Sequence, residues 1–449
     1  MIKLSGKIFS INGFWSLVLL LNMILSVQVC AQSNTEKLKE IYRDGDEFFQ
    51  DEDYKEALYY FLQLPDKGFI NANLQYKIGV CYLNLSGQEV KAVPYLESAA
   101  KRISLKYKAK NIDEKSAPLH TLFYLGKAYR IDNQLTNALR AYKKFYNNPE
   151  FEEFYNSKIV EREIESCEEA KIIQDSPVQV AWQNLGIPVN SEQPETHPVV
   201  SGNDSVLVYL FPLKFYNALY CTRKIDGKWQ QPENIIPQVM VDGDYYPTAL
   251  SYDGKELFLV KKNGSNYDIF MSHFAEGKWS PVCLLNKNVN STKDETYASI
   301  SKDGKVLYYS SNRRESKGGF DIFYSEKGPD GEWGPAQNLG KIINTREDEV
   351  APSIAADGKT LYFSSKGHFN MGGFDIFVST QSNDKTWSEP RNIGYPINTT
   401  NDNLGFQVVG DGKTGYLARI MPEGLGKEDI YKLEIRSDFV PKRKLKKRE

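Results

Sequence analysis

Five carboxylates recur at one position of a repeating pattern in the C-terminal half of the chain. Each lies nine residues before the aspartate of a predicted turn, in the loop that leads into a strand: Glu195, Asp244, Asp294, Asp348 and Asp402. Such loops would meet around one mouth of a ring of sheets, where the carboxylates could focus a negative field on a cation or a basic peptide. The alternative is that each carboxylate accepts backbone N–H bonds within its own loop. Recurrence in every repeat favours this second, structural role.

A second candidate site is an aromatic stripe in the N-terminal half. Tyr42, Tyr76 and Phe123 each stand three residues before a glycine of a helical repeat, and Lys127 and Arg130 flank the third. Because the three aromatics share one position, we expect them to face a common groove. Aromatic side chains of this kind often supply much of the energy that holds a partner segment. The stripe could equally pack against the second half of the same chain, and the sequence leaves both interpretations open.

The sequence lacks the common catalytic and metal-binding motifs. The chain contains no G-x-S-x-G and no H-E-x-x-H sequence, and its histidines (His120, His197, His273 and His368) are scattered. Its 5 cysteines form no C-x-x-C pair. The sequence therefore predicts a protein that is not an enzyme and that holds no metal and no cofactor.

The first 31 residues have the pattern of a cleaved signal peptide. Lys3 and Lys7 precede the apolar run 14–25, and small side chains precede a cut before Gln32. The alternative is a lipoprotein with Cys30 as the lipidated residue. With 56 Lys and Arg against 58 Asp and Glu, the chain has no excess of positive charge for nucleic acid. We expect an exported, periplasmic protein.

Residues 32–175 are predicted to form a helical array. Glycines at 45, 79 and 126 are each followed, 12 or 13 residues later, by an alanine in a second helix. A small residue at each place would let two antiparallel helices approach closely. Three such pairs and a terminal helix resemble tetratricopeptide repeats, which stack into a concave surface.

Residues 176–435 are predicted to form a five-bladed β-propeller. The turn Asp-Gly-Lys recurs at 253, 303, 357 and 411, with a weaker copy at 202–204, and each copy lies between two short strands. A third strand opens at Asp-Ile, and a tryptophan begins the fourth. The last repeat lacks its fourth strand, and 178–186 resembles an orphan fourth strand. We therefore expect 178–186 to close the ring by completing the last blade. The fold class is thus multidomain, α-helical and then all-β.

The repeats, such as INTREDEVAPSIAADGKTLYFSSKGHFNMGGFDIF at 343–377, resemble the WD-like propellers of envelope proteins that include TolB. The order of signal peptide, tetratricopeptide repeats and propeller resembles PorE-like proteins of Bacteroidota, which are associated with type IX secretion at the outer membrane. This chain continues into a basic tail, 436–449, rather than an OmpA-like domain. Direct anchoring to peptidoglycan is therefore not expected.

The resemblance implies a non-catalytic scaffold that holds outer-membrane or periplasmic proteins, with type IX secretion or gliding as the setting. A different class of function is a propeller that binds a glycan or peptide at its channel mouth. The tail carries six Lys and Arg among its last eight residues. Such a tail could contact anionic lipid headgroups at the membrane periphery or remain a solvated terminus.

Overall fold

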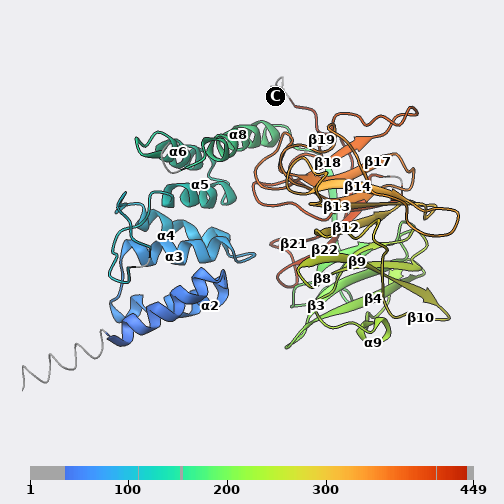
Figure 1. Cartoon of the computed structure of the whole chain (residues 1–449), viewed down its shortest axis with the longest axis horizontal. Coiled ribbons are helices and arrows are strands. Elements are labelled where there is room, and N and C mark those ends of the chain that lie inside the picture. The colour runs from blue at the N-terminus through green and yellow to red at the C-terminus, as the bar shows by residue number, and fades with distance from the viewer. Residues whose placement is uncertain (1–35, 110, 152–154, 411, 442–449) are drawn as a thin grey trace, which may run out of the picture. The chain divides into compact units, whose positions relative to one another are not determined.

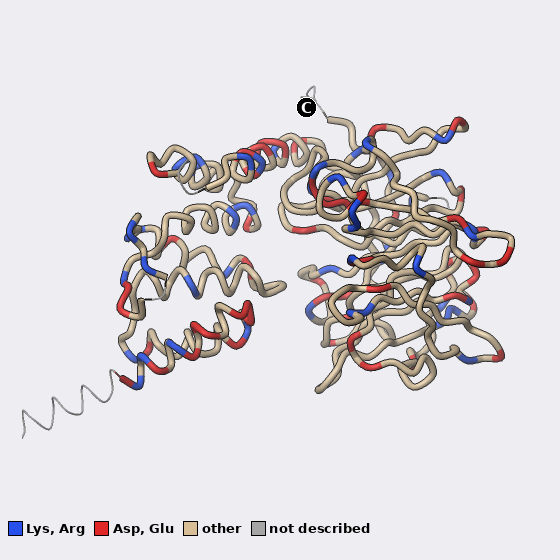
Figure 2. The backbone as a smooth tube through the Cα atoms, viewed as in Figure 1, with Lys and Arg blue, Asp and Glu red and all other residues tan. Residues whose placement is uncertain are grey.

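The computed structural model describes residues 36–109, 111–151, 155–410 and 412–441 (Figure 1). The chain divides into two compact units, Met1–Ser157 and Lys158–Glu449. The predicted signal peptide and the last eight residues of the basic tail lie outside the described residues. Within the described part of the chain, no helix combines the length and the apolarity that a bilayer span requires. Basic and acidic residues are interspersed along both units (Figure 2).

Unit 1 is a series of helices. Helix 36–50 is followed by α2 (Tyr54–Phe61), α3 (Ala72–Leu83), α4 (Ala92–Ala99), α5 (Thr121–Ile131) and α6 (Leu135–Tyr146), with short 3-10 turns η1 (Pro65–Lys67) and η2 (Glu89–Lys91). From α2 to α6, each helix packs against the next one along the chain. The side chains of Asp53 and Asn71 cap the N-termini of α2 and α3 by accepting from a backbone N–H three residues on. The predicted helical character of this half is confirmed.

Glycines set the spacing between these helices. A Cβ atom added at Gly79 would lie 2.5 Å from Leu96, and one added at Gly126 would lie 2.5 Å from Tyr142. The equivalent position, Gly45, would bring a Cβ within 2.8 Å of Phe61. Only hydrogen fits at these three places, so the prediction that they allow close approach of paired helices is confirmed.

The next helix, α8 (Ser157–Gln174), falls almost entirely within unit 2. Its Arg162 donates to the backbone carbonyls of Lys366 and His368, in a loop between two propeller strands. One turn later, Ser166 Oγ donates to Asn370 Oδ1 of the same loop at 2.8 Å. The compact units divide at 157/158, whereas the sequence pattern placed the boundary at 175/176. A terminal helix of the array and a helix docked on a propeller have the same amphipathic pattern, and only these contacts distinguish them.

The described residues of unit 2 form five antiparallel sheets, each with three main strands and one or two short outer segments. The first contains β2 (Thr196–Val200), β3 (Val206–Pro212), β4 (Asn217–Ile225), β5 (Lys228–Trp229) and β6 (Glu233–Asn234); helix α9 (Ile236–Val239) follows it. The second contains β7 (Tyr246–Leu250), β8 (Glu256–Asn263), β9 (Asn266–Ala275), β10 (Lys278–Trp279) and β11 (Cys283–Leu284). The third contains β12 (Glu295–Ile300), β13 (Val306–Ser311), β14 (Asp321–Glu326) and β15 (Gln337–Asn338). The fourth contains β16 (Glu349–Ile354), β17 (Thr360–Ser365), β18 (Asp375–Thr380) and β19 (Arg391–Asn392).

The fifth sheet closes the ring. It contains β20 (Gln407–Val409), β21 (Thr414–Arg419), β22 (Asp429–Ile435) and, as its outer strand, β1 (Val180–Asn184). β1 pairs antiparallel with β22 along its whole length, from Val180 opposite Ile435 to Asn184 opposite Tyr431. This confirms the five-blade count and the predicted closing strand. The ring needs such a strand because an unpaired β22 would expose its backbone groups at a sheet edge.

The innermost strands of the five blades are also tied to one another. Ile354 N–H of β16 donates to Ser299 Oγ of β12 at 3.0 Å, and Val408 N–H of β20 donates to Ser353 Oγ of β16 at 3.0 Å. At the seam between the last and first blades, Gly410 N–H donates to the Gly202 carbonyl at 3.3 Å. These bonds hold the walls of the central channel and fix the positions of the side chains at its mouths.

Candidate functional site

Three of the five predicted carboxylates are structural caps between blades. Each accepts a hydrogen bond, at 2.9 or 3.0 Å, from a backbone N–H in the preceding blade: Asp294 from Tyr267, Asp348 from Phe320 and Asp402 from Phe374. Asp348 also pairs with Lys366 at 2.8 Å, and the pKa of its carboxyl is lowered by these donors against the opposing effect of burial. The sequence favoured a structural role in which each carboxylate accepts backbone N–H bonds within its own loop. The structure shows such bonds, but the N–H donors lie in the preceding blade.

The other two carboxylates differ from this pattern. Glu195 is fully buried and accepts from Ser191 N–H and Ser191 Oγ. These bonds match those of Glu295 with Ser291, so Glu195 is the counterpart of Glu295 and not of Asp294. The sequence prediction placed Glu195 nine residues before Asp204. In the structure, the residue of the first blade that is equivalent to the turn residue Asp253 is Asn203, so the prediction was shifted by one residue. Asp244 is exposed, and its carboxylate accepts no hydrogen bond from another described residue.

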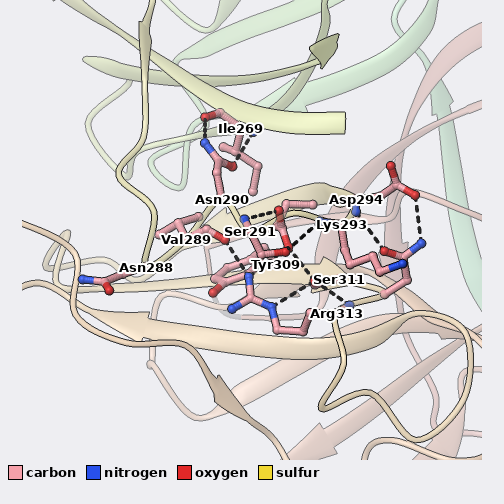
Figure 3. Close-up of polar contacts among 12 residues, drawn as sticks. Ile269, Asn288, Val289, Asn290, Ser291, Lys293, Asp294, Tyr309, Ser311 and Arg313 are labelled. Carbon is pink, nitrogen blue, oxygen red and sulfur yellow. Dashed lines mark hydrogen bonds and ion pairs between the residues drawn. The ribbon is translucent and has the colours of Figure 1, made fainter. Parts of the chain in front are cut away.

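Figure 3 shows the buried network at the start of the third blade. Asn290 accepts from Ile269 N–H at 2.8 Å and donates to the Ile269 carbonyl at 2.9 Å, which joins the second blade to the third. Beside it, Arg313 donates to Glu295 Oε1 at 2.9 Å and to the Val289 carbonyl at 2.6 Å. A buried carboxylate that has both a cation and hydroxyl donors is satisfied, so this network is part of the scaffold.

The fourth blade has the same buried carboxylate without the arginine. Glu349 is fully buried and accepts from the hydroxyl groups of Thr345 and Ser365 at 2.8 and 2.6 Å. The position of Arg313 is taken by Gly367, where a Cβ would collide with Thr345. Burial raises the pKa of Glu349 to about 7, against the lowering effect of its hydrogen-bond donors. Glu349 is a titratable group in the neutral range, buried beyond direct contact with solvent.

The accessible feature of the channel mouth is a set of aromatic side chains that the sequence analysis missed. The innermost strands begin at this mouth, and those of the first four blades are interrupted by bulges at equivalent places. His197, Tyr297 and Ala351 occupy these bulges with φ angles of +50°, +44° and +52°. Left-handed backbone is strained for bulky side chains, and strain of this kind concentrates at functional sites. Bulges also change the direction in which a side chain points.

The three rings at this mouth lie in a row. The His197 and Tyr246 rings are 5.5 Å apart, and the Tyr246 and Tyr297 rings are 6.3 Å apart. His197 is exposed at the surface, and desolvation by the surrounding protein lowers the pKa of its imidazole. Burial raises the pKa of both phenols, with Asp402 adding to the effect at Tyr297. None of the three side chains makes a hydrogen bond to another described residue, which leaves their polar atoms available to a ligand.

The sequence carried only a faint signal for this row. The bulge position holds His197, Pro247, Tyr297, Ala351 and Gly405 in the five repeats. Because the residue type differs in every repeat, this position does not stand out in the repeat pattern. Two large aromatic residues at a place where the other repeats have small residues or proline would have been the clue.

The opposite end of the channel is narrow. A cavity of about 30 Å³ lies between the ends of the innermost strands, lined in part by Tyr252, Lys302 and Gln407. This volume suffices for one or two water molecules.

The predicted aromatic stripe of unit 1 is largely covered. Tyr42 is 2% exposed and Tyr76 is 7% exposed, so the expectation that they face an open groove is wrong. Arg130 is also buried, while Phe123 and Lys127 are half-buried. Tyr42 packs on Phe61 and Phe69, and Phe123 packs on Tyr142 and Phe145. Side chains of unit 1 itself cover these rings, and partner binding by the five residues stays a prediction.

The histidines do not form a catalytic arrangement with neighbouring groups. His120 Nε2 is hydrogen-bonded to Tyr76 OH at 2.9 Å, and His368 Nε2 to the Ile343 carbonyl at 2.9 Å. His197 lies at the channel mouth. His273 is on β9, and its Nδ1 lies 3.8 Å from Oε1 of Glu256 on β8. Among the described residues, no group of three or more His, Cys, Asp or Glu is placed to hold a metal ion.

Comparison with known proteins gives fold likenesses only. No protein-family profile matches the chain, and no curated protein sequence matches it. Among solved structures, TolB from Acinetobacter baumannii is similar over 63% of this chain and 70% of its own, with 15% identity and a TM-score of 0.36. An α-L-arabinofuranosidase from Lactobacillus brevis is similar over 61% of this chain and 99% of its own, with 13% identity and a TM-score of 0.39. These scores are too low to carry an argument about family or activity.

Proposed function

We propose that the chain is a non-catalytic interaction protein whose propeller binds a short segment of a partner at the mouth formed by His197, Tyr246 and Tyr297. The observation that carries the proposal is a row of one exposed and two half-buried rings whose polar atoms have no partner among the described residues, with His197 and Tyr297 in a left-handed backbone. A strained, unpartnered polar surface is costly to maintain for the fold alone, and a ligand would use it.

The chemistry of the mouth favours a peptide with a cationic group. Phenol rings attract cations at their faces, and the Asp402 carboxylate is close enough to raise the pKa of Tyr297. The phenol oxygens and the imidazole add hydrogen-bond partners for a peptide backbone. A lysine or arginine side chain, or an amino terminus, fits this combination better than an acidic segment does.

Binding is favoured over catalysis by the state of the neighbouring carboxylates. Hydrolysis of a glycoside uses two carboxyl groups that face the bond to be broken. At this mouth, Asp294 and Asp402 are each committed to a backbone N–H of the preceding blade. The alternative function, recognition of a glycan, rests on the same rings, because aromatic faces can also stack on sugars.

The cellular setting is proposed from sequence. The signal-peptide pattern of residues 1–31 supports export to the periplasm, and the order of modules resembles PorE-like proteins with tetratricopeptide repeats. We propose that the partners are outer-membrane or periplasmic proteins, in an assembly of the type IX secretion or gliding class. In this setting unit 1 would offer a second binding surface, and the basic tail would contact membrane lipids peripherally.

A crosslinking experiment tests the mouth. A photoreactive phenylalanine placed at Tyr297 in the full chain should crosslink to a partner in intact cells, and mass spectrometry should identify the crosslinked peptide. The same group placed at Tyr252, at the other end of the channel, is the matched control. Replacing His197 and Tyr246 with Ala should reduce the crosslink at 297 at least tenfold. Crosslinks of equal yield at both ends, or a crosslink that persists in the double variant, would refute the assignment, and a glycan adduct would favour the alternative.

A further inference from the structure

The connection between α4 and α5 lies across the helices of unit 1 and is attached to them by polar contacts. We call its described residues, 101–109 and 111–117, the strap. The strap starts and ends at one place, because Ile103 pairs with Ala117 and Ser104 N–H donates to the Ala117 carbonyl at 2.9 Å. It is therefore an excursion from the helical path that covers part of the unit's surface and returns.

The helix beneath the strap carries polar side chains where a core would be apolar. Every residue of α3 is buried, including Asn73 and Lys77 on one face. Lys77 pairs with Asp46, and its ammonium lies over the Tyr42 ring at 5.0 Å. Burial of such groups costs free energy unless each has a partner. A helix whose only task was packing would not need them on this face.

Some of the hydrogen-bond partners of the Asn73 side chain lie in the strap. Its Nδ2 donates to Tyr42 OH at 2.8 Å, and its Oδ1 accepts from Tyr107 OH of the strap at 2.8 Å. The Tyr107 ring also lies edge-on to the Tyr76 ring, with centroids 6.5 Å apart. The strap therefore inserts one phenol against the polar face of α3, as a bound peptide would.

The face also recognises the strap backbone. Two consecutive carbonyls accept from it: Glu114 O from Asn73 Nδ2 at 3.4 Å, and Lys115 O from Ala72 N–H at 3.1 Å. One residue earlier, the Asp113 carboxylate pairs with Lys39 at 3.1 Å. Backbone carbonyls are present in any extended peptide, so these contacts are open to a segment from another molecule.

Between its ends, the strap buries little apolar surface. Leu105 is 49% exposed, Ile112 is half-buried, and Lys101, Lys106 and Lys108 are exposed. Its ties to the helices are a few hydrogen bonds, one exposed ion pair, the edge-on contact of Tyr107 with Tyr76, and the packing of Ile112 and Ala117 against the core of unit 1. Segments with few buried apolar contacts open at a small part of the global free energy of unfolding. We therefore expect the face beneath to become accessible without unfolding of unit 1.

We propose that the strap is an intramolecular ligand, and that the face beneath it binds an extended peptide carrying a tyrosine and an acidic residue. The binding elements are Ala72 N–H and Asn73 for the backbone, Asn73 and Tyr76 for the phenol, and Lys39 for the carboxylate. The strap occupies this face until a partner segment displaces it. This proposal concerns unit 1 and does not rest on the function proposed for the propeller mouth.

The test is to supply the strap in trans. In the full mature chain, residues 104–116 are replaced by a four-residue Gly-Ser linker, which the neighbouring positions of Ile103 and Ala117 allow. The synthetic peptide SLKYKAKNIDEKS, the sequence removed, should then bind in a calorimetric titration. The unmodified chain should bind the peptide at least tenfold more weakly, because its own strap competes at high effective concentration. Replacement of the tyrosine by phenylalanine in the peptide should weaken binding about five- to tenfold, the effect of one lost hydrogen bond.

Two controls keep the result interpretable. A scrambled peptide should not bind, and Asn73→Ala in the linker variant should abolish binding, whereas Asn137→Ala on α6 should leave it unchanged. A folded linker variant that binds neither peptide would overturn the proposal. If the linker variant does not fold, hydrogen exchange on the unmodified chain decides: strap amides should exchange at least a hundredfold faster than those in the middle of α3. Equal protection would make the strap a structural element and refute the proposal.

Discussion

Glu349 and Glu295 provide a matched pair for measuring the free energy of an isolated buried carboxyl group. Both are fully buried at equivalent positions, and both accept from a Ser or Thr hydroxyl four residues earlier. Glu295 forms an ion pair with Arg313, whereas Glu349 forms no ion pair with another described residue and has only a longer-range electrostatic interaction with Arg162. The perturbation is the substitution Glu349→Gln, with Glu295→Gln as its counterpart. The Thr345 and Ser365 hydroxyls can rotate to accept from the new amide, so the substitution need not leave a hydrogen bond unmade.

The expected pH dependence has a definite sign. The pKa of Glu349 is raised from 4.5 to about 7 in the folded chain. Below 4.5 the carboxyl is protonated in both states and has no effect on stability. As the pH rises from 4.5 to about 7, the unfolded chain ionises while the folded chain keeps its proton, and the free energy of unfolding falls. At 1.36 kcal/mol per unit, the total loss is on the order of 3 kcal/mol. Glu349→Gln removes this loss, so the variant should exceed the parent in stability at pH 8.

The assay is urea unfolding followed by tryptophan fluorescence between pH 4.5 and 8. Trp182, Trp229, Trp279, Trp333 and Trp387 all lie in unit 2, so the signal reports the propeller. Glu295→Gln should lose about 3 kcal/mol at every pH, because it leaves Arg313 buried without its carboxylate. If the free energies of the parent and Glu349→Gln differ by the same amount at pH 4.5 and pH 8, Glu349 is not neutral in the folded chain and the reasoning fails.

Three further changes test the architecture. Gly79→Val should lower the stability of unit 1 by about 1–3 kcal/mol, since its Cβ would overlap Leu96, and helical circular dichroism during heating would show it; a variant as stable as the parent would mean that the helices can move apart. Deletion of 178–186 should lower the urea midpoint of the whole propeller, because β22 becomes an edge, and an unchanged midpoint would contradict closure by β1. Arg162→Met removes the donor to the loop after β17, so it should increase hydrogen exchange in α8 at least tenfold. Exchange in β12 should not change. Unchanged exchange in α8 would mean that apolar packing alone holds this helix.

Most of the fold could be predicted from short sequence patterns that recur along the chain. The Asp-Gly-Lys turns, the Asp-Ile strand starts and the alternation between them predicted the blades, because each of these features acts within a few residues. The orphan strand 178–186 was predictable because the last repeat lacked its partner. The glycines of unit 1 were predictable for a similar reason, since helix pairs that approach closely leave no room for a side chain at the crossing.

Tertiary structure alone decided which of these residues are accessible. The sequence placed Tyr42 and Tyr76 on one face of the helices, but the strap and neighbouring rings cover that face. It also could not assign α8 to unit 2, because a few polar contacts from Arg162, Ser166 and Glu169 to one loop leave no periodic signal. At the channel mouth, His197 and Tyr297 stand where other repeats have different residues. Repetition encodes the scaffold through local geometry, whereas burial and access depend on contacts between segments far apart in the chain, which the repeat pattern does not record.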